Sequence, residues 1–126
     1  MNRALPVSIM MLALLGSAAA QNTTDPAAAK KLRAALSQAE KSYKDTKAKY
    51  TKNPKDATAK KKYVDATVHF GTTTMNSPLL SPREKYPKSL RLYREALKVD
   101  PKNKEAANNI KLIESIYKQM GRPIPK

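Results

Sequence analysis

The chain has 126 residues and no cysteine, so disulfides contribute nothing to its stability. It carries 25 lysines and arginines against 10 aspartates and glutamates, a formal net charge of +15 at pH 7. Lysine outnumbers arginine 19 to 6, which disfavours base reading and bidentate phosphate recognition, because both rely on the arginine fork. The diffuse positive field that remains favours association with polyanions.

Residues 1–20, MNRALPVSIMMLALLGSAAA, have the features of a secretory signal peptide. Arg3 precedes an apolar run over 7–15, and the alanines at 18–20 supply a small-residue cleavage site. The apolar run is too short to span about 30 Å of hydrocarbon as a helix, and no later segment approaches a transmembrane run. We therefore expect cleavage before Gln21 and a periplasmic or secreted bacterial protein.

Residues 21–126 are expected to form one small all-α domain, because no segment shows the alternation of a strand. The first helix is predicted over 26–52, with Asp25 as its N-cap and Pro26 at its first position. Its apolar residues recur at alternating spacings of four and three, which places them on one narrow stripe. The stripe consists of Leu32, Leu36, Ala39, Tyr43, Thr46 and Tyr50.

The second helix is predicted over 54–75, with Asn53 as its cap and Pro54 as its first residue. The stretch NSPLLSPREK follows, and its two prolines predict a long loop between the second and third helices. Within that loop, SPRE at 81–84 matches a capping box and a short helical turn, which Pro87 is expected to interrupt.

The third and fourth helices are predicted over 87–99 and 103–120. VDPKN forms the turn between them, Asn103 caps the fourth helix, and Gly121 ends it. RPIPK then closes the chain as an extended tail. A proline-rich end of this kind can dock on a partner, although more often it only terminates a helix.

Small and aromatic residues recur at helical spacing in YPKSLRLYREALKVDPKNKEA, 86–106, before and after a proline turn. The repeat-motif residues are Tyr63, Ala66 and Phe70 in one helix, Ser89, Tyr93, Ala96 and Pro101 in the next helix and its turn, and Tyr117 beyond. This pattern resembles the tetratricopeptide repeat, a helix-turn-helix unit of about 34 residues. The resemblance implies a TPR-like array of four helices that binds a protein or peptide partner through packed helix faces. The helical pattern by itself also fits a plain four-helix bundle.

Repeat units bury their apolar faces on neighbours, and about three units are usually needed for stability. Four helices make at most two units. We therefore expect the first helix to act as a cap, or the domain to associate with a second copy or a partner.

Catalytic chemistry finds little support in the residues. His69 is the single histidine, and Asp65 lies four residues before it, a spacing that usually gives a surface hydrogen-bonded pair. A glycine-rich phosphate loop and a cluster of metal ligands are both missing from the sequence pattern. We expect a non-enzymatic protein without cofactor, metal or small-molecule substrate.

The basic face of the first helix is the second candidate site. On a helical wheel it projects opposite the apolar stripe and consists of Lys30, Arg33, Lys41, Lys44 and Lys52. It predicts either a face that binds anionic polymers or surfaces, such as nucleic acid, envelope polymer or anionic lipid, or only a solvated surface. The alternative function is therefore a small cationic protein with weak polyanion binding.

Overall fold

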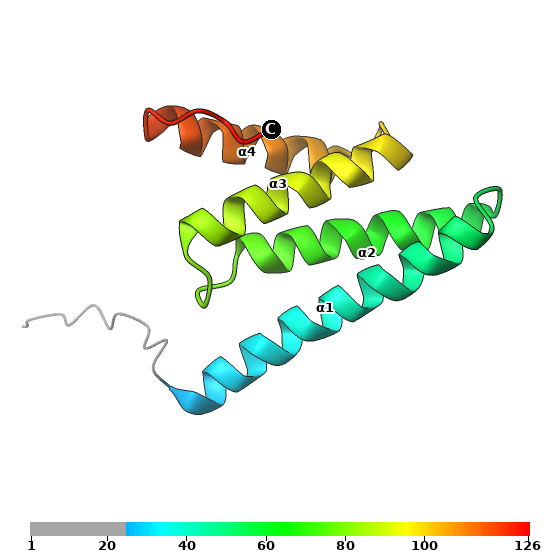
Figure 1. Cartoon of the computed structure of the whole chain (residues 1–126), viewed down its shortest axis with the longest axis horizontal. Helices are drawn as coiled ribbons and strands as arrows, with labels where there is room; N and C mark the ends of the chain where they lie inside the picture. Colours follow the sequence, from blue (N-terminus) through cyan, green and yellow to red (C-terminus); the bar gives the residue numbers. More distant parts are fainter. Residues whose placement is uncertain (1–24) are drawn as a thin grey trace, which may run out of the picture.

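The computed structural model describes residues 25–126, which form four α-helices and no strand (Figure 1). The helices are α1 (Pro26–Lys52), α2 (Ala57–Met75), α3 (Pro82–Val99) and α4 (Lys104–Gln119). The predicted all-α class is confirmed, and the predicted signal peptide lies outside the described residues. Among the helices of 25–126, none combines the length and the apolarity needed to cross a membrane.

The start of α2 differs from the prediction, whereas α1 has the predicted bounds and its predicted cap, Asp25. Asn53 belongs to the end of α1, because its amide donates to two carbonyls of the last turn. Asp56 caps α2 instead and accepts hydrogen bonds from the amides of Thr58 and Ala59 at 2.8 and 3.1 Å. Pro54 therefore lies in the turn, and the cap falls on the acidic residue next to the helix.

The connection between α2 and α3 is short, and the prediction of a long loop there is wrong. Only residues 76–81 separate the two helices, because α3 begins at Pro82 and not at Pro87. The amide and hydroxyl of Ser81 donate to the Glu84 carboxylate at 2.9 and 2.8 Å, so the capping box is present. Pro87 removes one backbone donor, but the loss falls close to this fixed start and α3 continues through it.

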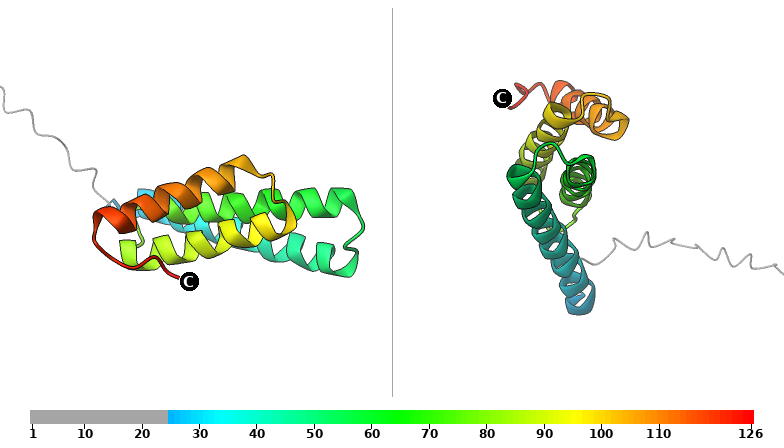
Figure 2. Two further views of the ribbon diagram at one scale, coloured as in Figure 1. Left: turned by 90° about the horizontal axis from the view of Figure 1, so that it is seen from above. Right: turned by 90° about the vertical axis from the view of Figure 1, so that its right-hand side faces the viewer.

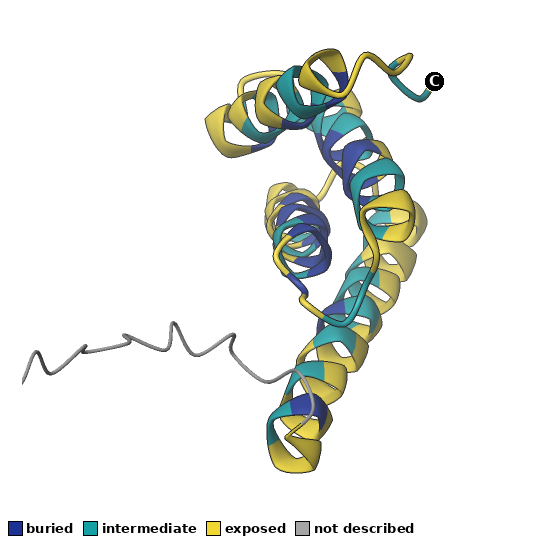
Figure 3. Cartoon of the chain, turned by 90° about the vertical axis from the view of Figure 1, so that its left-hand side faces the viewer, coloured by how far each residue is buried: buried dark blue, intermediate teal, exposed yellow. Residues whose placement is uncertain are grey.

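Each helix packs against its neighbours in sequence. Viewed along their axes, α1, α3 and α4 follow a curved row, and α2 lies on the inner side of the curve (Figures 2 and 3). Because α2 and α4 lie on the same side of α3, they face each other across the concave side of the domain.

Two groups of apolar side chains hold this arrangement together. The larger core joins α2, α3 and α4 and consists of Val64, Val68, Met75, Leu90, Tyr93, Ala96, Ala106, Ile113 and Tyr117. A smaller one joins α1, α2 and α3 through Ala39, Phe70 and Leu92, with Tyr43 packed against them. One face of α2 therefore packs against α1 through the smaller core, and another packs against α3 and α4 through the larger core.

The C-terminal tail folds back onto its own domain. Gly121 adopts a positive φ of 62°, which reverses the chain after α4, and the Arg122 amide donates to the Tyr117 carbonyl at 3.0 Å. Ile124 packs against the larger core, and Nη1 of Arg94 donates to the Pro125 carbonyl at 2.8 Å. The tail therefore covers part of the α3 and α4 edge, and its docking surface is intramolecular.

Gly71 of α2 lies against the Tyr93 ring of α3, and its replacement tests this packing. A Cβ there would lie 2.9 Å from Cε1 of the fully buried Tyr93 ring. Gly71→Ala should lower the free energy of unfolding by about 1 kcal/mol or more, because overpacking strain exceeds the gain in helix propensity. Urea unfolding measures the change.

A matched alanine substitution in the facing helix provides the contrast. The Ser89 hydroxyl is fully buried without a hydrogen-bond partner, so Ser89→Ala should leave stability unchanged or raise it. A stabilising effect of Gly71→Ala would contradict the close packing of the two helices.

Candidate functional site: the groove between α2 and α4

The repeat-motif residues pack the helices together and do not form the surface of a site. Tyr63, Phe70, Ser89, Tyr93, Ala96 and Tyr117 are buried, Ala66 is half-buried, and Pro101 is exposed in the turn before α4. Tyr93 is central among them, because its ring is fully buried and its hydroxyl reaches toward both α2 and α4. These residues therefore hold the helices in place, and other side chains form the surface of the concave side.

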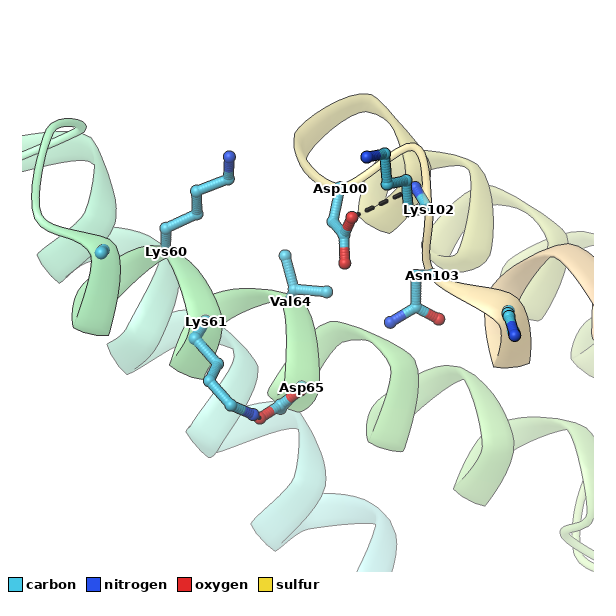
Figure 4. A pocket seen from close by; sticks show the side chains of 9 residues that line it. Lys60, Lys61, Val64, Asp65, Asp100, Lys102 and Asn103 are labelled. Carbon is cyan, nitrogen blue, oxygen red and sulfur yellow. Dashed lines mark hydrogen bonds and ion pairs between the residues drawn. The ribbon is translucent and has the colours of Figure 1, made fainter.

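Two adjoining cavities, of about 510 and 270 Å³, open between α2 and the start of α4, and together they form the α2–α4 groove. Figure 4 shows the larger of the two. Asp65 and Asn103 line both cavities. The larger cavity is also lined by Ala57, Lys60, Lys61, Val64, Asp100, Lys102 and Lys104. The smaller one is also lined by Val68, His69, Thr72 and Glu105. A cavity of the larger size accommodates several side chains of a ligand.

The turn between α3 and α4 sets one wall of the groove. The Asp100 amide donates to the last turn of α3, and the Asp100 carboxylate accepts from the Lys102 amide at 3.1 Å. Asn103 caps α4 as predicted, by accepting from the Ala106 amide at 2.9 Å. These bonds fix the backbone that carries Lys102 and Asn103 to the groove.

Lysines dominate the larger cavity. Lys61 pairs with Asp65 at 2.7 Å, whereas Lys60, Lys102 and Lys104 form no ion pair within residues 25–126. In Figure 4, Lys60 lies on one side of Val64, and Lys102 lies on the other. Asp100 also lies beside Val64, which is itself only 3% exposed, so the cavity has an excess of lysines over carboxylates and little apolar surface from Val64.

A network of polar side chains closes the other end of the groove. The Tyr93 hydroxyl lies 2.9 Å from the Thr72 hydroxyl and accepts from Nδ2 of Asn109 at 3.1 Å. Thr72 also donates to the Glu105 carboxylate at 3.1 Å. Burial raises the pKa of Tyr93 above its ordinary value, although the hydrogen bonds with Thr72 and Asn109 act in the opposite direction. This end offers hydrogen bonds and a carboxylate where the first end offers cations.

The surface hydrogen bond expected between Asp65 and His69 is absent from the described part of the chain. Asp65 pairs with Lys61 instead. His69 is exposed and lines the smaller cavity. Across 25–126, no three side chains of the types that bind metals come together as a possible site.

A second polar cluster centres on Glu95 of α3, where three helices meet. Its carboxylate accepts from the Tyr43 hydroxyl at 2.8 Å, from Nζ of Lys47 at 2.7 Å, and from the Tyr63 hydroxyl. The Tyr50 ring stacks on Tyr63, with centroids 5.2 Å apart. Because Glu95, Tyr43, Lys47 and Tyr63 bind one another inside the domain, their role is to join α1 and α2 to α3.

The cluster shifts the pKa values of its members. Burial acts to raise the pKa of Glu95, but the hydrogen bonds from Lys47, Tyr63 and Tyr43 outweigh it, and the pKa lies below its ordinary value. Burial and the hydrogen bond to Glu95 together raise the pKa of Tyr63. Glu95 is therefore ionised, and the two tyrosines are neutral, throughout the physiological range.

The five residues of the basic face of α1 are all exposed. Lys41 pairs with Asp45 at 2.6 Å, and Lys44 pairs with Glu40 at 2.8 Å, one helical turn away in each case. Of the five basic residues, three therefore remain without an ion pair within residues 25–126, Lys30, Arg33 and Lys52. No cavity brings Lys30, Arg33 and Lys52 together in the described structure.

Sequence reasoning missed the groove lysines and Glu95. Lys60 and Lys102 are ordinary surface residues in the helical pattern, and only the packing of α2 beside the turn before α4 brings them to one cavity. The one local signal for this part of the groove was the VDPKN turn, because its hydrogen bonds fix the backbone at Lys102. Glu95 gave no signal of its own beyond lying between apolar positions of the third helix.

The chain matches no family model, no curated protein and no solved structure.

The acid dependence of stability tests the role of Glu95. A carboxylate whose pKa is lowered by folding stabilises the domain above its unfolded pKa, near 4.5, and this stabilisation is lost as the pH falls through the folded pKa. Glu95→Gln should lower the free energy of unfolding at pH 7 by about 1–2 kcal/mol, because hydrogen bonds to a charged group are lost.

The difference between Glu95→Gln and the wild type should shrink below pH 4.5, as measured by urea unfolding over a pH series. Glu40→Gln, which removes an exposed pair with Lys44, is the control and should have a much smaller effect. A pH-independent difference for Glu95→Gln would show that the charge of Glu95 is not what stabilises the cluster.

Proposed function

We propose that this protein is a non-enzymatic interaction module that binds a segment of another protein in the α2–α4 groove. The observation that carries the proposal is a concave cavity of about 510 Å³ that is lined by four lysines and two aspartates, beside a turn whose backbone is hydrogen-bonded. The resemblance of the sequence to the tetratricopeptide repeat also supports it, because arrays of that family present concave surfaces to their partners. Fold alone does not assign a function, so the groove residues carry the argument.

The setting proposed for this interaction is the bacterial envelope or the extracellular space. It rests on the signal peptide predicted over residues 1–20. Self-association is the less favoured form of partnership, because two copies that each carry a large positive charge repel one another.

Polyanion binding through the basic face of α1 is the rival function. Its support is the net charge of +15, and the local pairing of Lys41 and Lys44 with acidic neighbours weakens it. Binding through diffuse charge should also weaken steeply with salt, whereas a segment seated in a groove keeps its apolar and hydrogen-bond contacts.

Peptide selection followed by nuclear magnetic resonance mapping tests the proposal. Peptides selected from a random library on the purified chain should shift amide resonances within 57–72 and 100–109, which border the groove. They should leave the first half of α1 unaffected. Shifts centred on Lys30, Arg33 and Lys41, or spread evenly over the lysines, would overturn groove binding in favour of the rival function.

A further inference from the structure

The larger cavity of the groove has a definite charge preference. We infer that it binds an acidic segment of a partner protein, with side-chain carboxylates placed between Lys60, Lys102 and Lys104. This inference rests on the proposed function and specifies the chemistry of the ligand.

Charge accounting within the cavity supports an anionic ligand. Four lysines and two aspartates line it, and the Asp65 carboxylate already neutralises Lys61. Asp100 accepts from the Lys102 amide and forms no ion pair in the described chain. Three lysine side chains therefore face one free carboxylate, and a ligand with several carboxylates complements the excess.

The helix ends contribute little to this preference. α2 and α4 begin at the cavity, but α3 ends beside it, and the capping residues Asp56 and Asn103 already accept from the first free amides. The C-terminal end of α3 offsets one of the two N-terminal dipoles, and the Asp56 carboxylate offsets much of the other. The preference therefore comes from the lysine side chains.

The lining also distinguishes protein from nucleic acid. No aromatic side chain and no arginine lines the larger cavity, so it offers neither a stacking platform for bases nor a bidentate fork for phosphate. Val64 lines the cavity but is only 3% exposed, so the lysine ammonium groups are the main groups that a ligand can contact. Such a lining fits the separate carboxylates of an acidic peptide better than a nucleic acid, which favours arginine forks and stacking rings.

Two charge-matched variants can distinguish binding in this cavity from binding through the general positive charge of the protein. The groove variant combines Lys60→Ala, Lys102→Ala and Lys104→Ala, and the control combines Lys30→Ala, Lys31→Ala and Arg33→Ala. All six residues are exposed, and the control sites lie at the start of α1, at the opposite end of the domain from the cavity (Figure 1). Both variants lose the same charge, and thermal unfolding should confirm that both remain folded.

The probe is a short fluorescent peptide of alternating glutamate and alanine, and binding is followed by fluorescence anisotropy. The groove variant should bind it about tenfold more weakly than the wild type, because three exposed ion pairs each contribute a few-fold in affinity. The control variant should stay within about twofold. The same peptide with glutamine in place of glutamate should not bind.

Several results would overturn the inference. These are equal weakening by both variants, equal binding of the glutamine peptide, absence of binding to the wild type, or tighter binding of single-stranded DNA through the same three lysines. If selected peptides still shift resonances of the groove while the affinity of the glutamate peptide does not depend on these lysines, only the acidic preference fails. If neither peptide maps to the groove, the proposed function fails as well.

Discussion

The carboxylate of Glu95 is the constraint on which the arrangement of the helices depends. It takes hydrogen bonds from Tyr43 and Lys47 of α1 and from Tyr63 of α2, and so ties both helices to α3. A partly buried charge is costly unless its hydrogen-bonding capacity is filled, and three donors fill it here. With α2 fixed beside α3 in this way, and α4 packed on α3 through the larger core, the groove between α2 and α4 has defined walls.

Intramolecular contacts cover the apolar surface at both ends of the row of helices. α1 covers the outer side of α2 and contributes Ala39 and Tyr43 to the smaller core. At the other end, the tail folds back and packs Ile124 against the larger core. Leu112 of α4 and Met120 at its C-cap remain 50% and 44% exposed, so the covering at this end is partial. Four helices can thus bury two cores within one chain.

Local signals in the sequence predicted most of the helices, and contacts between distant residues decided the rest. Asp25 and Asn103 were predicted as caps because their side chains act on adjacent amides. Two other features depend on which local signal prevails in the packed domain. Asp56 caps α2 where Asn53 was expected to, and α3 starts at the Ser81 capping box and continues through Pro87. The groove could not be predicted, because Lys60 and Lys102 belong to segments that meet only after folding.

The central claim is that a partner protein occupies the α2–α4 groove, and site-specific photocrosslinking in the native host tests it most directly. Asp65 lines both cavities of the groove and is exposed, whereas Arg33 lies on the basic face of α1. A photoreactive side chain at position 65 should give a discrete protein adduct that persists at high salt, and one at position 33 should not. An adduct that forms equally from both positions, or only with anionic polymer at position 33, would contradict the account.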